Sequence, residues 1–260
     1  MKKFVALLLA VLMVASLCAC GQKGTGSDLQ TVTKGKLIMS TNAEFAPYEY
    51  VADDGKGFQG TGYEGIDIEI AYALAQKLGL ELVVDNMDFD AALSAVQTGK
   101  SDIVAAGVTV TPDRLNAMSF TDSYANGVQV VIVKEDSDIK SIDDLQGKKI
   151  GTQRGTTGFL YCSDDFGDDN VIGFDDGATA VQNLKAGKID CVVIDNVPAQ
   201  EYVKANPGLT ILDTEYANED YAIGIAKDNT ALQEALNKAL AELKADGTIQ
   251  SIIDKYIPAK

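Results

Sequence analysis

Residues 95–104 read Ala-Val-Gln-Thr-Gly-Lys-Ser-Asp-Ile-Val, which is a helix end, a Gly-Lys-x-Asp turn and an apolar strand. Residues 184–193 repeat this order as Leu-Lys-Ala-Gly-Lys-Ile-Asp-Cys-Val-Val. A second matching pair precedes them, Gly-Lys-Leu-Ile at 35–38 and Gly-Lys-Lys-Ile at 147–150. The repetition predicts two similar α/β lobes that follow one another in the chain. Chance similarity between common helix-turn-strand sequences is the alternative, because each match is short.

Strand-like apolar segments alternate with segments of helical period around the first copy. Apolar residues recur every three or four positions up to Leu78, and Gly79 then supplies a helix C-cap. The predicted order is strand 36–40, helix 70–78, strand 81–84, helix 89–97 and strand 103–106, with helices again over 229–257. Such an order favours a parallel sheet covered by helices, and ligands of such sheets bind beyond the carboxyl ends of the strands.

Composition excludes several functional classes. The 260 residues are 46% hydrophobic and 23% charged, which is typical of a globular protein of one large or two smaller domains. The net charge of −16 disfavours binding to nucleic acids or to anionic membrane surfaces. The chain has no His, so a Ser-His-Asp triad, a Cys-His dyad and a His-based zinc site are excluded.

The N-terminus has the pattern of an export signal. Two lysines are followed by the apolar run 4–15, which is shorter than the roughly 20 residues of a membrane span. Residues 17–21, Leu-Cys-Ala-Cys-Gly, resemble the cleavage site of bacterial lipoproteins, in which the second Cys, Cys20, carries lipid such as palmitate. We therefore expect a signal peptide at 1–19 and a lipid-anchored flexible tether at 20–36. A plain secretory peptide is the alternative.

Arg114 is a candidate carboxylate ligand. It follows Thr111-Pro112-Asp113, in which Thr is a good N-cap, Pro suits the first helical position and Asp complements the helix dipole. A guanidinium in this turn can hold a carboxylate with two parallel hydrogen bonds, helped by the Thr109 hydroxyl. The alternative is an exposed Arg that pairs with a nearby Asp.

Two further strand ends carry polar groups. Asp195 closes an apolar strand before a predicted helix, where it is either an N-cap or an acceptor for an ammonium group. Residues 155–158, Gly-Thr-Thr-Gly, precede another helix and form an anion-binding turn. One cation, one anion and hydroxyl-rich turns are complementary to a zwitterion such as an α-amino acid.

Four longer motifs carry a resemblance. They are residues 42–50 (Asn-Ala-Glu-Phe-Ala-Pro-Tyr-Glu-Tyr), 65–71 (Gly-Ile-Asp-Ile-Glu-Ile-Ala), 106–114 and 155–158. From about Lys36 onward the chain resembles the polar amino-acid-binding proteins of bacterial ABC importers, which are solute-binding proteins of family 3 with a type II periplasmic-binding-protein fold.

The resemblance implies a domain organisation and a set of ligand residues. It places lobe 1 at 37–124 plus 222–260, lobe 2 at 128–218, and hinge strands near 124–128 and 217–221. It implies a ligand carboxylate held by Arg114, Thr109, Gly107 and Thr157, an α-ammonium held by Asp195, and a side chain contacted by Asn42, Phe45, Phe89, Glu44 and Gln153.

The chemical type of the ligand side chain stays open at this point. Asn42 stands where many relatives that bind basic or amide side chains carry Asp, and the two amides favour a polar ligand over Val or Leu. If Glu44 points into the cleft, Arg or Lys should bind best. If Glu44 faces solvent, as its Pro-containing turn favours, neutral ligands such as Gln or Ser are expected.

The expected function is that of a monomeric, extracytoplasmic, lipid-anchored receptor without enzymatic activity, cofactor or metal. It would capture a polar L-amino acid by hinge closure and deliver it to an ABC permease. One alternative is an enzyme on the same fold, like cyclohexadienyl dehydratases, with Glu44 as general acid. Another is a ligand-binding sensor module without transport. Cys162 and Cys191 are either two buried thiols or a disulfide.

Overall fold

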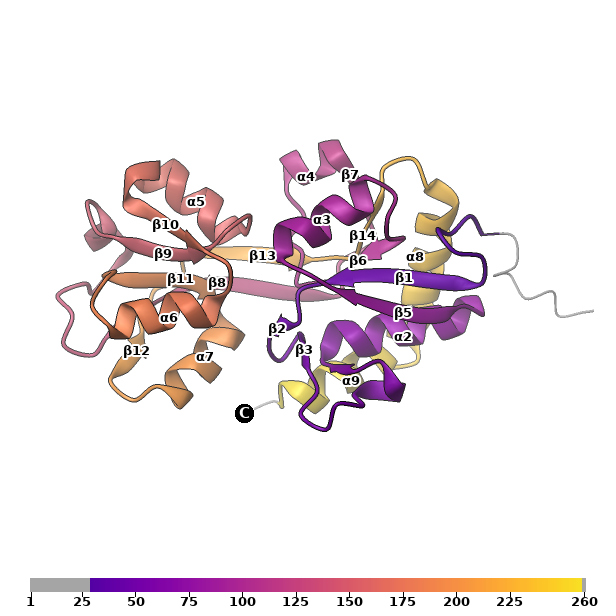
Figure 1. Cartoon of the computed structure of the whole chain (residues 1–260), viewed down its shortest axis with the longest axis horizontal. Helices are drawn as coiled ribbons and strands as arrows, with labels where there is room; N and C mark the ends of the chain where they lie inside the picture. Colours follow the sequence, from indigo (N-terminus) through magenta and orange to yellow (C-terminus); the bar gives the residue numbers. More distant parts are fainter. Residues whose placement is uncertain (1–28, 259–260) are drawn as a thin grey trace, which may run out of the picture.

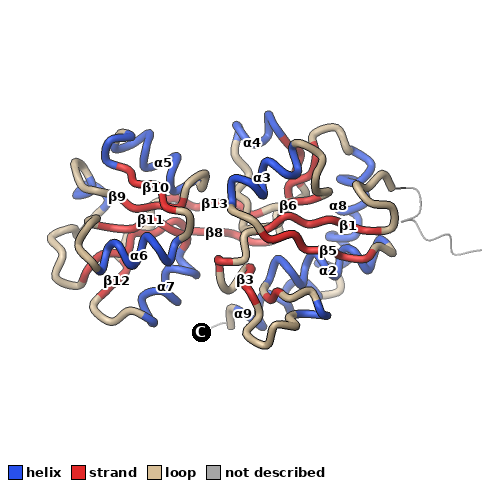
Figure 2. The backbone as a smooth tube through the Cα atoms, in the orientation of Figure 1, coloured by secondary structure: helices blue, strands red, loops and turns tan. Residues whose placement is uncertain are grey.

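Two β-sheets, each with its own helices, form the two lobes seen along the long axis in Figure 1. This computed structural model describes residues 29–258, so the predicted signal peptide and Cys20 lie outside the described residues. Two strands run between the lobes, as the tube in Figure 2 shows. The predicted α/β fold class with two similar lobes is therefore confirmed.

The sheet of the first lobe combines segments from both ends of the chain. Its strands are β1 (Lys36–Thr41), β5 (Glu81–Asn86), β6 (Ile103–Val104), β7 (Met118–Phe120) and β14 (Gly224–Ala226). They lie in the order β5-β1-β6-β14-β7, with β1 parallel to β5 and β6 and with β14 antiparallel to its neighbours. Because β14 follows the second lobe in sequence, the chain returns to the first lobe before it ends.

Five of the described helices belong to this lobe: α2 (Ile66–Leu78), α3 (Phe89–Gln97), α4 (Pro112–Ala117), α8 (Thr230–Ala245) and α9 (Thr248–Tyr256). Helix α3 has the predicted bounds, and α2 ends at the predicted left-handed Gly79, whose φ is 68°. Helix α2 begins four residues before the predicted start. Its first turn contains Asp67 and Glu69, whose charges the helix dipole favours at that position.

The second lobe has a sheet with the order β10-β9-β11-β8-β12. Its strands are β8 (Ala125–Lys134), β9 (Ile150–Gln153), β10 (Val171–Phe174), β11 (Cys191–Asp195) and β12 (Leu209–Ile211). Strand β13 (Ala217–Tyr221) pairs antiparallel with the first half of β8 and forms the second link between the lobes. The helices of the second lobe are α5 (Thr157–Phe166), α6 (Gly177–Lys185) and α7 (Asn196–Ala205).

A third, small sheet is separate from both. It consists of β2 (Glu44–Phe45), β3 (Glu49–Val51) and β4 (Tyr63–Glu64).

The repeated Gly-Lys-x-Asp turns have the same structural role in both lobes. Asp102 accepts a hydrogen bond from the Ile38 amide at 2.7 Å, and its own amide donates to the Ile38 carbonyl at 2.8 Å. Asp190 makes the equivalent pair with Lys149, at 2.8 and 2.9 Å. The first turn is thus fastened to β1 and the second to the residue that precedes β9, which gives the sequence repeat a physical basis.

The predicted tether is shorter than expected at its C-terminal end. The Asp102 carboxylate also accepts a hydrogen bond from the Val32 amide at 2.7 Å, and the Asn229 side chain donates to the Gln30 carbonyl at 3.0 Å. Residues 30–32 thus lie against the first lobe, and the prediction of a flexible segment up to residue 36 is wrong for this part.

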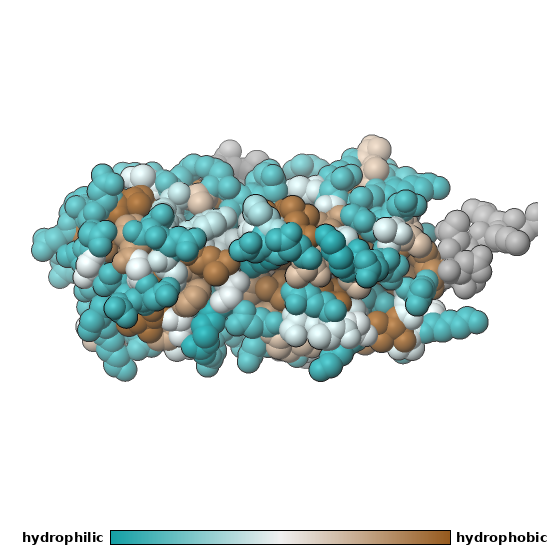
Figure 3. All heavy atoms as spheres, turned by 90° about the horizontal axis from the view of Figure 1, so that it is seen from above, coloured by the Kyte–Doolittle hydropathy of each residue, from teal (hydrophilic) through white to brown (hydrophobic). Residues whose placement is uncertain are grey.

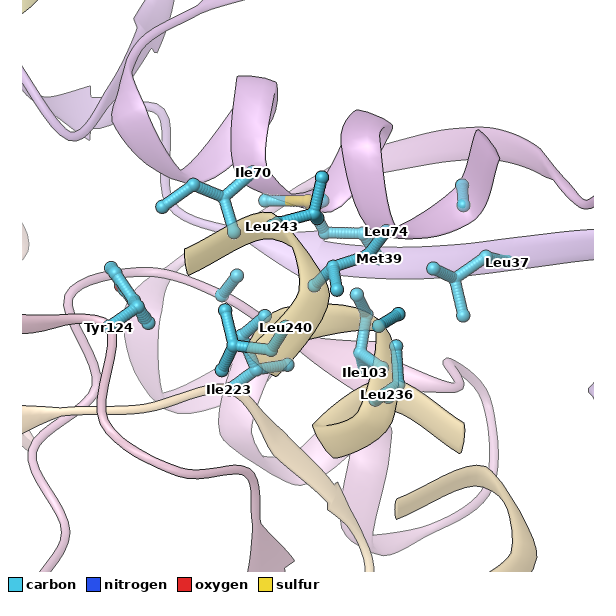
Figure 4. Close-up of a cluster of buried hydrophobic side chains, with 14 of the residues drawn as sticks. Leu37, Met39, Ile70, Leu74, Ile103, Tyr124, Ile223, Leu236, Leu240 and Leu243 are labelled. Carbon is cyan, nitrogen blue, oxygen red and sulfur yellow. The ribbon is translucent and has the colours of Figure 1, made fainter. Parts of the chain in front are cut away.

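The core of the first lobe lies between its sheet and the helices α2 and α8. Figure 4 shows side chains from these elements packed together, and Leu37, Met39 and Leu74 are fully buried. In the second lobe, Cys162 and Cys191 are buried free thiols within the core. Of the two possibilities left open by the sequence, the structure shows two separate thiols and no disulfide between them.

The surface is consistent with the acidic composition. The face in Figure 3 is mostly hydrophilic, with small separate apolar patches over both lobes. Within residues 29–258, no helix combines the length and the apolar composition that a membrane span needs.

A substitution at Gly65 tests how closely the chain packs at the junction between β4 and α2. Its φ of 128° and ψ of 172° lie in a region that is essentially restricted to glycine, and an added Cβ would lie 2.1 Å from the Tyr48 carbonyl oxygen. Gly65→Ala should lower the free energy of unfolding by at least about 3 kcal/mol in urea titrations.

Gly79→Ala is the matched control, because Gly79 also has positive φ but its added Cβ would meet nothing within 4 Å. Gly79→Ala should lower the free energy of unfolding by only about 1–2 kcal/mol. Equal losses for the two variants would contradict the steric argument at Gly65.

Candidate functional site

A cavity lies between the lobes, where the carboxyl ends of β1, β6, β9 and β11 meet. It contains about 480 Å³ of space not filled by protein atoms, part of it open to solvent. The predicted ligand residues all line it except Glu44: Asn42, Phe45, Phe89, Gly107, Thr109, Arg114, Gln153, Thr157 and Asp195. The structure therefore brings residues from both lobes to one site, at the edge expected for such sheets.

Arg114 enters the cavity from the first turn of α4. The Thr111 hydroxyl caps this helix by accepting a hydrogen bond from the Arg114 amide at 3.2 Å, and Pro112 occupies the first helical position. The guanidinium donates from Nη1 to the Thr109 carbonyl at 2.8 Å and from Nη2 to the Gly155 carbonyl at 3.1 Å. Since Gly155 belongs to the second lobe, the Arg114 side chain joins the two lobes.

Arg114 is only 8% exposed, and a buried cation favours binding of an anion. Its carbon atom lies 5.5 Å from the centre of the Phe89 ring, in cation–π geometry. Burial lowers the pKa of Arg114, and the nearby Glu219 carboxylate acts in the opposite direction. Among the described residues no carboxylate forms an ion pair with this guanidinium, and a ligand carboxylate would provide the counter-charge.

Asp195 lies at the end of β11 and caps the next helix, which is one of the two roles considered from the sequence. Its Oδ1 caps α7 by accepting a hydrogen bond from the Val197 amide at 2.9 Å. Its Oδ2 accepts from the Val128 amide at 3.0 Å and from the Tyr221 hydroxyl at 2.9 Å, so it holds both crossing strands. Burial raises the pKa of Asp195 to about 6 despite these hydrogen bonds. The carboxylate is therefore ionised above that pH and can accept a cationic group.

Two amides meet across the cavity. Gln153 donates from Nε2 to the Asn42 side-chain oxygen at 2.9 Å, while Asn42 donates to the Met87 carbonyl at 3.0 Å. Like the contact between Arg114 and Gly155, this hydrogen bond joins the first lobe to the second. The amide groups supply both donors and acceptors to this end of the site.

The Gly-Thr-Thr-Gly turn begins α5. The Thr156 hydroxyl caps the helix by accepting a hydrogen bond from the Phe159 amide at 3.3 Å, and it donates to the Gln153 carbonyl at 2.8 Å. Thr157 is buried and lines the cavity in the first turn of the helix. The helix N-terminus thus points its partial positive charge toward the site.

Gly107 differs from the expectation in one respect. Its amide donates to the Asp67 carboxylate at 2.8 Å, so this N–H is already used within the first lobe. Gly107 lines the cavity, but its amide is already engaged and is not free for the predicted backbone contact with a ligand carboxylate. Adding a Cβ to Gly107 would bring it within 2.9 Å of the Phe45 ring, which explains the need for glycine here.

Glu44 lies outside the cavity. It is exposed on β2, and its pKa is raised by partial burial and by the nearby carboxylates of Asp176 and Asp88. In this structure Glu44 therefore does not line the cavity, unlike the other residues predicted to contact the ligand side chain. Its turn faces solvent, as the Pro-containing sequence favoured.

Several lining residues were not among the predicted ligand residues, namely Glu49, Gln129, Thr156 and Tyr221. Gln129 could have been recognised from the sequence, because it is an amide residue within the apolar run of β8. Its Nε2 donates to the buried Glu219 carboxylate at 2.9 Å. Tyr221 and Glu49 could not, since their positions depend on how β13 and β3 pack against the first lobe.

Comparisons with known proteins agree with this architecture. Residues 37–259 match the family described as bacterial extracellular solute-binding proteins, family 3. An arginine-binding extracellular protein of Bacillus subtilis is 34% identical, over 98% of each chain. Among solved structures, an ancestral arginine-binding protein bound to arginine is 40% identical, with a TM-score of 0.78 over 86% of this chain and 99% of that one.

A second structure, an ancestral arginine-binding protein bound to glutamine, is 39% identical, with a TM-score of 0.80 over 87% of this chain and all of that one. The family match spans nearly all of the described chain, and the structural neighbours share its type II periplasmic-binding-protein fold. The chain therefore belongs to the bacterial extracellular solute-binding proteins of family 3.

Proposed function

We propose that this protein is an extracytoplasmic receptor that captures a polar L-amino acid and delivers it to an ABC transporter permease. The observation that carries the proposal is the placement of Arg114 and Asp195 in one cavity. A buried guanidinium and a buried carboxylate that line the same cavity are complementary to the two charges of an α-amino acid. The names of the relatives, which include arginine-binding proteins, support the same ligand class.

Capture by hinge closure follows from the contacts across the cavity. We propose 37–124 with 222–260 as one moving lobe, 128–218 as the other, and the paired segments of β8 and β13 as the hinge. The hydrogen bonds from Arg114 to Gly155 and from Gln153 to Asn42 exist only when the lobes are together. A ligand that contacts both lobes stabilises that closed arrangement, because the open arrangement lacks half of its contacts.

The proposed ligand side chain is polar and ends in an amide or a guanidinium group. Phe45 and Phe89 offer aromatic surface to an alkyl chain, and Asn42 and Gln153 offer polar partners to its end. An apolar ligand would leave these amides without partners, which costs about 1–3 kcal/mol for each buried group. The ancestral homologues bound to arginine and to glutamine support this class.

The competing functions receive less support. An enzyme of the dehydratase type needs a general acid in the cavity, and Glu44, the residue considered for that role, lies outside it. A sensor module would use the same cavity, so it differs from a transport receptor only in its partner. We also propose that a lipid on Cys20 anchors the protein outside the cytoplasm and that the protein acts as a monomer.

Arg114 should dominate the affinity. Arg114→Ala should weaken binding of L-glutamine or L-arginine by at least about 2 kcal/mol, roughly 30-fold, because the ligand carboxylate loses its buried cation. Arg114→Lys should restore only part of the affinity, since Lys lacks the bidentate fork. Isothermal titration calorimetry measures both.

Arg154→Ala is the control, because Arg154 is a half-exposed arginine that pairs with Asp175 away from the cavity lining. It should leave the affinity within about threefold of the wild type. Unchanged affinity in a folded Arg114→Ala protein would remove Arg114 from the proposed site.

Glu44 should have little influence on affinity. Glu44→Gln should change the Kd for L-glutamine or L-arginine by less than about threefold, because exposed charges contribute little. A loss of arginine affinity well beyond threefold would place the carboxylate in contact with the ligand. Tighter binding of Leu or Val than of every polar amino acid would overturn the polar side-chain site.

Cys20→Ser should release the protein from the membrane fraction without changing its affinity for the ligand, because a lipid chain requires the Cys20 thiol. Cell fractionation followed by immunoblotting measures the release. Membrane retention of a variant whose signal peptide has been removed would contradict the lipid anchor.

A further inference from the structure

A second carboxyl group lines the cavity besides Asp195. Glu49 on β3 is 1% exposed and belongs to the cavity lining. Its Oε2 atom is buried and has no hydrogen-bond partner among the residues that the structure describes. A buried carboxyl oxygen without a partner is costly, and the residue that carries it lines the cavity.

Glu49 is one member of a buried acidic pair. Asp67 in the first turn of α2 is also 1% exposed, its carboxyl group adjoins that of Glu49, and its Oδ1 likewise has no partner within the described part of the chain. The Asp67 amide donates to the Tyr48 carbonyl at 2.9 Å, which fixes α2 against β3. Gly65 permits this close approach, so the fold holds the two carboxyl groups together.

The surroundings of the pair are acidic or phenolic. Tyr124, at the start of the crossing strand, adjoins Asp67, and Tyr48 precedes Glu49 in the chain. The Tyr48 hydroxyl is close enough to Glu49, Asp67 and Asp195 for all three carboxyl groups to raise its pKa. Among the described residues, no Lys or Arg acts on Glu49 or Asp67. The pair therefore lies on the Asp195 side of the cavity, where the ligand ammonium is expected.

Two adjacent buried carboxyl groups cannot both be ionised without a compensating cation. Burial and the neighbouring Asp67 raise the pKa of Glu49 well above its usual range, and burial raises that of Asp67 to about 6. A proton shared by the pair therefore resides mainly on Glu49. This proton removes one of the two adjacent negative charges while no ammonium group is bound.

We propose that Glu49 is a proton-linked part of the ligand site, which releases its proton to solvent when the α-ammonium of an amino acid binds beside it. The inference rests on the proposed function, because it requires a ligand with an α-ammonium. The exchange is local to this side of the cavity: the ammonium group replaces the proton beside Glu49, while the ligand carboxylate is paired with Arg114 on the other side. Asp67 connects the pair to the cavity lining at Gly107, because its Oδ2 accepts a hydrogen bond from the Gly107 amide.

The sign of the pH dependence follows from this exchange. A ligand that displaces a proton binds more tightly as the pH rises, by up to about tenfold per pH unit for one proton. Between pH 7 and 8, Asp195 and Asp67, each with a pKa of about 6, are already ionised. Proton release in that interval therefore reports on Glu49.

Calorimetry in buffers of different ionisation enthalpy measures the released proton. Titrations with L-glutamine and with L-arginine, in phosphate and in Tris at pH 7 and 8, should show release of close to one proton per ligand by the wild type. Glu49→Gln mimics the protonated side chain, so it should still bind but without proton release and with a nearly pH-independent Kd. Glu81→Gln, an exposed surface variant paired with Lys36, should behave as the wild type.

Infrared difference spectroscopy of the wild type gives a measurement that needs no variant. Addition of ligand at pH 7 should remove one protonated-carboxyl band. Binding heat itself tests the proposed function, whereas its dependence on the buffer tests this inference, so the two can fail separately. Wild-type binding without proton release, or proton release unchanged in Glu49→Gln, would overturn the role of Glu49.

Discussion

The burial of charge between two lobes is the constraint on which the rest of the structure depends. Arg114 is held by one carbonyl from each lobe, at Thr109 and at Gly155, and these two contacts neutralise none of its charge. A guanidinium in such a place is stable only if the fold keeps it well hydrogen-bonded and leaves room for an anion. The cap at Thr111, the short helix α4 and the helix N-terminus of α5 all serve that arrangement.

The crossing strands connect this charge to the movement of the lobes. Asp195 accepts hydrogen bonds from Val128 on β8 and from Tyr221 on β13, so the carboxylate proposed for the ligand ammonium also fixes the root of the hinge. Tyr221 packs edge-on against Tyr48, beside Glu49. The groups proposed to bind the ligand and the segments proposed as the hinge are therefore the same or direct neighbours, so a small ligand bound there could set the position of the two lobes.

Local rules predicted much of this structure and failed where long-range packing decides. The Thr111-Pro112 start of α4, the Gly79 end of α2 and the whole of α3 depend on caps and periodicity within a few residues. Strands β7 and β14 were missed, because each is defined by pairing with a segment about a hundred residues away. Glu44 and Glu49 lie in one motif, yet only the pairing of β2 with β3 and the contact with α2 decide which of them reaches the cavity.

The central claim is that the cavity recognises the two charges of an α-amino acid. The most direct measurement compares, by calorimetry, L-glutamine and L-arginine with analogues that lack the α-carboxylate or the α-ammonium. The account predicts that removal of either group weakens binding at least about 30-fold, since a buried partner is then left without its counter-charge. An analogue without the carboxylate or without the ammonium that binds as tightly as the amino acid would contradict it.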